Sequence, residues 1–199
     1  MRLVDLLSPR RVVVPLPAAT LEEGMRILVD ACVADGRVSD PGRLAQAISE
    51  SWPEDTMTIG PHAWLPHFRS DAVPALVVAL GIAPEPMAAD PDRPGLRMIL
   101  LVVAPPREAA AYLQTVAAFA RALARREVAD SLLAAEGPDD VLRLEALRQI
   151  ELLGQLLVRD IMTANVVAIG PEVALAEAAR VLMQHAIEAV PVVSAGGEV

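Results

Sequence analysis

Residues 75–82 read ALVVALGI and residues 97–104 read RMILLVVA, and these two apolar runs are the most informative about the fold. Both are short and rich in aliphatic and β-branched side chains, and neither alternates between apolar and polar positions. Such runs are typical of strands that are buried on both faces of a sheet. We therefore expect two adjacent central strands, covered by helices on at least one face.

Helical patterns flank these runs on both sides. Thr20 and Glu23 match a capping box, in which the threonine hydroxyl accepts from the amide three residues on. The helices expected from apolar periodicity and end signals cover residues 21–34, 41–50, 107–126, 127–135 and 139–157, and a short strand is expected over 11–15. Because strands alternate with helices, the sequence predicts an α/β protein.

Two proline-rich segments, residues 51–69 and 83–94, are expected to be irregular. The first contains His62 and His67, whereas His185 ends a predicted helix whose last carbonyls it can cap. A metal site built from all three histidines would need distant segments to converge without a helical i, i+4 pair. We therefore expect no metal site.

Composition limits the classes of function. The net charge of −9 argues against a nucleic-acid backbone or an anionic membrane as the partner. All 17 basic residues are arginine, which excludes chemistry that needs a lysine amine. Cys32 is the single cysteine, so no internal disulfide forms, and its apolar helical setting predicts a buried thiol. The apolar run 98–104 is too short to span a membrane and the N-terminus does not resemble a signal peptide, so we expect a cytosolic protein.

The order of motifs over residues 1–145 is more specific than any single motif. It runs from LVDLLSPRRVVVPL (3–16) through Leu65-Pro66-His67 to SDAVPALVVALG (70–81) and YLQTVAAFARAL (112–123). This order resembles the enzyme IIA domain of the fructose and nitrogen-regulatory branch of the bacterial phosphotransferase system. The resemblance implies a central mixed sheet flanked by helices. It also implies that His67 accepts a phosphoryl group from the histidine phosphocarrier protein.

The chemistry of such a site is accessible to this chain. A neutral imidazole that titrates near pH ~6.5 is a good nucleophile at cytosolic pH, and its phosphoramidate stays reactive enough to pass the group on. Tyr112 stands where the family has a second histidine, and residues 49–52 read SESW where an arginine is usual. We therefore expect His62, Arg69 and Tyr112 to compensate for these groups around the phosphate.

A second set of motifs occupies residues 157–199. Asp160-Ile161-Met162-Thr163 precedes a helical pattern, and Ala189-Val190-Pro191-Val192 follows it. These motifs resemble the first half of a cystathionine-β-synthase-type (CBS) motif, with strands expected over 166–169 and 190–193 and a helix over 172–184. The chain ends before the parts that hold an adenosine nucleotide, so we expect no cofactor here. An adenine nucleotide is expected only for a full-length CBS pair.

These resemblances divide the chain into three parts. Residues 1–145 form the enzyme IIA-like domain, residues 146–158 a linker helix, and residues 159–199 a truncated βαβ fragment of a CBS domain. An incomplete CBS motif should expose a sheet edge and an apolar helix face, and the helix over 139–157 has an apolar stripe. We therefore expect a homodimer.

Two functions remain open at this point. In the first, the protein is a regulatory enzyme IIA-like component that accepts phosphate on His67 and acts on a regulatory protein target, coupled to a CBS sensing module. In the second, the same fold is a scaffold that is not phosphorylated and signals through its surface and its nucleotide-sensing tail. Neither function calls for nucleic acid or membrane as a partner.

Overall fold

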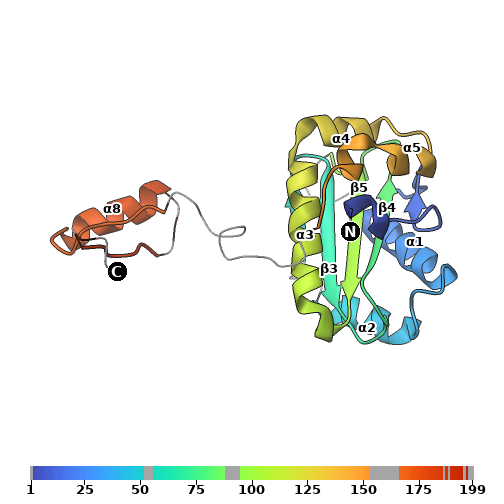
Figure 1. Ribbon diagram of the computed structural model, residues 1–199, viewed down its shortest axis with the longest axis horizontal. Helices are drawn as coiled ribbons and strands as arrows, with labels where there is room; N and C mark the ends of the chain where they lie inside the picture. The colour runs from blue at the N-terminus through green and yellow to red at the C-terminus, as the bar shows by residue number, and fades with distance from the viewer. Residues whose placement is uncertain are drawn as a thin grey trace. The chain divides into compact units, whose positions relative to one another are not determined.

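The computed structural model describes residues 2–51, 56–87, 95–152, 166–185, 187, 189–194 and 196. The chain divides into two units, Met1–Gln155 and Leu156–Val199. Each unit is described by itself, and Figure 1 shows their elements. None of the described helices combines the length and apolarity that a membrane span requires.

A five-stranded mixed sheet forms the centre of the first unit, in the order β1-β4-β5-β3-β2. The strands are β1 (Val12–Val13), β2 (Thr56–Ile59), β3 (Ala63–Arg69), β4 (Val77–Ile82) and β5 (Met98–Ala104). Strand β5 is parallel to β3 and antiparallel to β4, while β1 is parallel to β4 and β2 antiparallel to β3. The predicted pair of adjacent central strands is confirmed, and every residue of β4 and β5 is buried.

Helices cover both faces of the sheet (Figure 1). The helices of this unit are η1 (Leu3–Leu6), α1 (Leu21–Ala34), α2 (Pro41–Ser51), η2 (Pro106–Glu108), α3 (Ala109–Ala124), α4 (Arg126–Leu133), α5 (Pro138–Arg143) and α6 (Glu145–Arg148). Helix α1 has the predicted bounds. Its N-terminus is capped as expected, because Glu23 N donates to Thr20 Oγ1 at 3.1 Å. The α/β class and the mixed sheet are therefore confirmed.

The sheet separates two apolar cores. Alternate residues of a strand point to opposite faces, so Leu65 of β3 packs in the core under α3, with Phe119. Trp64 and Phe68 of the same strand pack in the second core, under α1, with Leu28. This alternation decides which helix each side chain of β3 meets.

Gly24 allows α1 to approach the sheet closely. A Cβ at Gly24 would lie 2.5 Å from Ile99 Cδ1 and 3.1 Å from Leu16 Cδ2, and both side chains are fully buried. We expect Gly24→Ala to lower the free energy of unfolding by about 1–3 kcal/mol, because buried neighbours must move. The matched control is Gly42→Ala in α2, where the nearest atom, Asp40 Oδ1, is 3.5 Å away. There the higher helix propensity of alanine should raise stability by up to ~1 kcal/mol. Equal losses of stability in the two variants, measured by urea titration, would contradict the close approach of α1 to the sheet.

The prediction that residues 51–69 are irregular is wrong over 56–69, where β2 and β3 form a hairpin. Pro61 and Pro66 account for the wrong prediction, because each occupies a position that a sheet tolerates. Pro61 lies in the hairpin turn after Gly60, whose φ of 56° favours glycine. Pro66 lies where the β3–β5 ladder is interrupted.

The prediction of one helix over 139–157 is wrong over the described residues 139–152. Helices α5 and α6 are separated by Leu144, whose backbone is extended (φ −60°, ψ 109°). After α6 the chain pairs with the N-terminal segment, where Leu3 N donates to Ile150 O at 2.8 Å and Arg2 bridges Glu151. Backbone pairing thus replaces helix at this point, and residues 153–158 of the expected linker helix lie outside the described residues.

The second unit contains helix α8 (Leu175–His185) and one parallel bridge between Ile169 and Val192. The strands predicted over 166–169 and 190–193 are therefore reduced to that bridge, because two short strands alone have little to stabilise them. The predicted exposure of an apolar helix face is confirmed, since Leu175 is 90% and Met183 82% exposed.

Candidate functional site

His67 lies near the carboxyl end of β3, an inner strand of the sheet. By the alternation of β3 it shares a face with Ala63 and Leu65, which belong to the core under α3. His67 itself is only partly buried, whereas the residues on either side of it, Pro66 and Phe68, are buried. The strand therefore holds the backbone of His67 rigidly and leaves part of its imidazole accessible.

Pro66 interrupts hydrogen bonding just before His67. The β3–β5 register pairs Trp64 with Ile99 and resumes only at His67 with Val102, because proline has no amide hydrogen to donate. At this gap, Nδ1 of His67 lies 3.1 Å from the carbonyl oxygen of residue 65. A carbonyl can only accept, so Nδ1 carries the hydrogen and Nε2 holds the lone pair. The proline–histidine pair therefore leaves Nε2 as the imidazole nitrogen with a free lone pair.

Tyr112, in the first turns of α3, lies against His67. The two ring centroids are 5.9 Å apart with an interplanar angle of 29°, and Tyr112 Oη donates to the backbone carbonyl of His67 at 3.3 Å. The tyrosine is buried. It therefore supports both the ring and the backbone of His67 from the α3 side.

Arg69 follows His67 on the same face of β3 and is exposed. It lines an open cleft of about 550 Å³ between α2 and the end of β3. The cleft is lined by Asp40, Arg43, Gln46, Ala47, Glu50, Arg69, Ser70, Asp71 and Pro106. Within the described residues Arg69 makes no ion pair, whereas Arg43 pairs with Asp71 at 3.1 Å. Arg69 is thus the available cation closest to His67 along β3.

His62 does not join this site. It precedes β3, where its Nδ1 lies 3.1 Å from the carbonyl oxygen of Gly95, and five residues of extended strand put it roughly 16 Å from His67. The structure thus brings Tyr112 and Arg69 toward His67 but leaves His62 at the other end of the strand. No cluster of metal-binding side chains occurs in the described parts of the chain.

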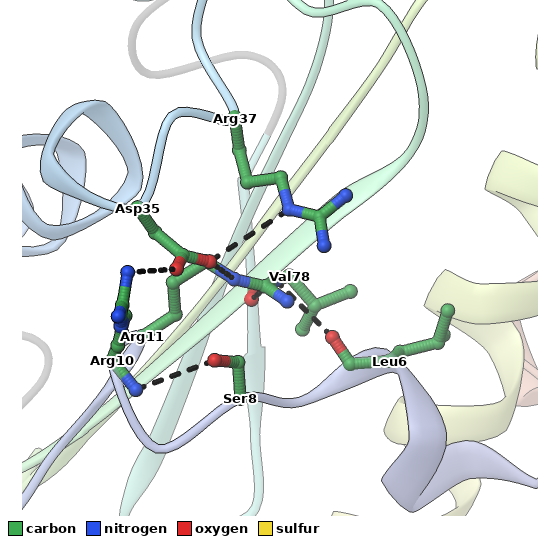
Figure 2. A network of polar contacts seen from close by, with 7 residues as sticks. All are labelled: Leu6, Ser8, Arg10, Arg11, Asp35, Arg37 and Val78. Atoms are coloured by element: carbon green, nitrogen blue, oxygen red, sulfur yellow. Dashed lines mark hydrogen bonds and ion pairs between the residues drawn. The ribbon is translucent and has the colours of Figure 1, made fainter.

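A network centred on Arg11 was not predicted from the sequence, because nothing in the local pattern shows that this arginine is buried (Figure 2). Its Nε donates to Asp35 Oδ2 at 2.8 Å, and its Nη1 donates to the carbonyl oxygens of Val78 at 2.6 Å and Leu6 at 3.2 Å. Arg11 therefore joins η1, β4 and the end of α1.

Cys32 is buried beside this network, as the sequence predicted. Burial is the main cause that raises the pKa of its thiol to about 11, the nearby Arg11 lowers it, and Asp35 raises it further. The thiol therefore stays protonated at neutral pH and does not act as a nucleophile.

The fold and the site define the first unit as an α/β domain that presents a histidine from an inner strand of a mixed sheet. The chain belongs to the family of phosphoenolpyruvate-dependent sugar phosphotransferase system EIIA 2 domains, whose model matches residues 5–146. A CBS domain model matches residues 158–199.

Two curated proteins match parts of the chain. The fructose-specific EIIA component of the phosphotransferase system from Haloferax volcanii is 31% identical over 127 residues, which cover 63% of this chain and 82% of that protein. Inosine-5'-monophosphate dehydrogenase from Korarchaeum cryptofilum is 47% identical over 45 residues, only 10% of its own length. The second match therefore concerns a small segment of that enzyme.

Solved structures share the fold. The nitrogen regulatory protein IIA-Ntr from Neisseria meningitidis aligns with a TM-score of 0.63 at 14% identity, over 72% of this chain and 97% of that one. The mannitol IIA protein from Escherichia coli aligns with a TM-score of 0.58 at 24% identity, over 71% of this chain and 98% of that one. A third similar structure is a complex of Escherichia coli enzyme IIAMTL with phosphorylated enzyme IIBMTL, with a TM-score of 0.56 at 22% identity, covering 71% of this chain and 96% of that one.

Proposed function

We propose that this protein accepts a phosphoryl group on Nε2 of His67 from a phosphorylated phosphocarrier protein and passes it to a second protein. The observation that carries the proposal is the contact between His67 Nδ1 and the Leu65 carbonyl, which leaves the lone pair on Nε2. Family membership supports it, since EIIA domains are components of the phosphotransferase system.

The transfer step needs no cofactor. The Nε2 lone pair forms a bond to phosphorus as the bond to the donor's phosphohistidine nitrogen breaks, and that electron pair returns to the donor imidazole. Because such transition states are loose, the protein contributes position and charge around three phosphoryl oxygens. Arg69 is the cation available for these oxygens on β3.

The recipient is a protein, by analogy with the Escherichia coli complex of enzyme IIAMTL with phosphorylated enzyme IIBMTL. The CBS domain at residues 158–199 favours a regulatory role for the protein. The resemblance described above implies that full-length pairs of CBS modules bind adenine nucleotides. The histidine phosphocarrier protein is the donor in this proposal. The exposed apolar side chains of α8 further support a homodimer.

Incubation with the phosphorylated histidine phosphocarrier protein, followed by intact mass measurement, tests the proposal. We expect the chain to gain one phosphoryl group that is stable in base and lost in acid, as a phosphoramidate is. A chain that gains no mass from this donor or from phosphoramidate would instead be the non-phosphorylated scaffold.

The tyrosine beside His67 sets the expected rate of labelling. Tyr112 is neutral, so Tyr112→His would add an imidazole that can donate a charge-assisted hydrogen bond of about 2 kcal/mol to the phosphoryl group, which speeds transfer roughly thirtyfold. Tyr112→Phe is the control, because it keeps the ring against His67 and removes only the hydroxyl. Quenched-flow sampling measures the labelling rates. If Tyr112→His and the unchanged protein label at equal rates, residue 112 does not set the rate of transfer.

A further inference from the structure

The two ends of the first unit, as far as its residues are described, pair with each other. We call the paired segments, residues 2–6 and 150–152, the strap. Leu3 N donates to Ile150 O at 2.8 Å, and one antiparallel bridge lies beside this bond. Leu3 is fully buried in the core under α3. The strap therefore fastens the N-terminal segment to the end of the domain.

Little backbone pairing closes the strap. Within the described residues, the pairing between its two segments consists of that hydrogen bond and that bridge. Terminal segments held in this way open locally at a lower cost in free energy than the core of a domain. The strap also continues along the chain into the second unit, which begins at Leu156. A rearrangement of the second unit that pulls on the chain therefore acts on residues 150–152.

The closed strap supports α3. Helix η1, which lies in the strap, contacts both α3 and α6. Leu3 of η1 belongs to the same buried core as Tyr112 of α3. Tyr112 Oη in turn donates to the backbone carbonyl of His67 at 3.3 Å. One path of contacts therefore leads from the strap through α3 to the backbone of His67.

A second path leads through Arg11 to the strand that holds His67. Helix η1 ends at Leu6, whose carbonyl oxygen accepts from Arg11 Nη1 at 3.2 Å. The same nitrogen donates to the carbonyl oxygen of Val78 in β4 at 2.6 Å. Val78 pairs with Val102 of β5, which pairs with His67 of β3. A displacement of η1 therefore disturbs the bonds of a buried guanidinium on this row of the sheet.

We propose that the strap is a conformational switch for His67. When the strap is closed, it holds α3 and the row of β4, β5 and β3 that position the imidazole. When it opens, both supports loosen and phosphoryl transfer slows. The effect on transfer rests on the proposed function, whereas the effect on the order of β3 around His67 does not. Because the strap continues into the CBS domain at residues 158–199, that domain can act on His67 through it.

A reversible disulfide across the strap tests the switch. Arg2 and Glu151 form a non-hydrogen-bonded antiparallel pair, because the bond from Leu3 N to Ile150 O flanks them. Such a pair places its Cα atoms about 4.5 Å apart, which is within the range that a disulfide spans. Oxidised glutathione therefore closes the strap of Arg2→Cys/Glu151→Cys by removing two hydrogen atoms, and reduction releases it. Cys32 does not interfere, because it is buried.

Amide hydrogen exchange of the full chain, oxidised against reduced, is the first readout. We expect oxidation to slow exchange about tenfold at Leu3 and at least about threefold at Tyr112 and His67. Helix α1 is the internal reference, because it packs in the second core. Its amides should slow less, which separates the strap from the general stabilisation that a disulfide gives. Slowing confined to the strap, or equal slowing in α1, would overturn the inference.

The rate of labelling by phosphoramidate is the second readout. Leu3→Pro removes the donor of the strap's hydrogen bond, and proline fits this position because Leu3 is the first residue of η1 and Arg2 before it is extended. Leu3→Ala is the matched control, since it shortens the same side chain and keeps the amide. We expect Leu3→Pro to label about fivefold more slowly than Leu3→Ala. Adding the disulfide to Leu3→Pro should restore the rate on oxidation.

Equal labelling rates for the two Leu3 variants, or a rate that oxidation does not restore, would overturn the switch. If Leu3→Pro does not fold, hydrogen exchange in the disulfide variant that keeps Leu3 decides the question. If phosphoramidate does not label the unchanged chain, the proposed function fails. Hydrogen exchange at His67 then still decides whether the strap holds this residue in place.

Discussion

His67→Ala should take up no phosphoryl group from either the phosphocarrier protein or phosphoramidate, the largest change we expect in activity. The variant removes the nitrogen that forms the bond to phosphorus, and no other described group offers an imidazole at this position. His62→Ala should label at the rate of the unchanged protein, because His62 lies at the other end of β3 against the Gly95 carbonyl.

The position of the label gives a second check on the same site. With Nδ1 held to the Leu65 carbonyl, phosphorus should be bound to Nε2, which nitrogen-15 and phosphorus-31 NMR can distinguish from Nδ1. Label on Nδ1, or label that persists in His67→Ala, would show that the nucleophile has been assigned incorrectly.

Arg11→Met should give the largest loss of stability, lowering the free energy of unfolding by about 3 kcal/mol. The substitution removes the close partner of Asp35. It also leaves the buried carbonyl oxygen of Val78 and the partly buried one of Leu6 without the Arg11 donor. Urea unfolding followed by the fluorescence of the buried Trp64 measures the change.

Two variants separate this explanation from a general loss of packing. Arg10→Met removes a neighbouring but exposed guanidinium 3.9 Å from the same carboxylate, and should change stability by less than about 0.5 kcal/mol. Adding Asp35→Asn to Arg11→Met should recover part of the loss, since the carboxylate that has lost its close partner is then neutral. A double variant less stable than Arg11→Met would contradict the role of the ion pair.

The local sequence was sufficient to predict an element correctly wherever its residue pattern favoured a single structure. The apolar runs that became β4 and β5, and the Thr20 cap that begins α1, carry their information within a few neighbouring residues. The same reasoning failed for β3, because Pro61 and Pro66 are read locally as breaks. Only the partner strands show that one lies in a turn and the other in a ladder gap.

The candidate site was predicted in part. The resemblance pointed to His67 and to Tyr112, which are 45 residues apart in sequence and in contact in the structure. His62, five residues before His67, was grouped with them as a replacement for groups that the family has at the site. An extended strand separates such residues by roughly 16 Å, so nearness along the chain was misleading here.

The α/β class and the two central strands could therefore be predicted from the sequence, because both depend on residue types and their local order. The candidate nucleophile followed from the resemblance to the family. Two features came from the tertiary structure alone: which imidazole nitrogen of His67 is free, and that Arg11 is buried against Asp35. These depend on distances between segments far apart in the chain. No local pattern of charge or hydrophobicity specifies such distances, since they arise when the two cores pack on the sheet.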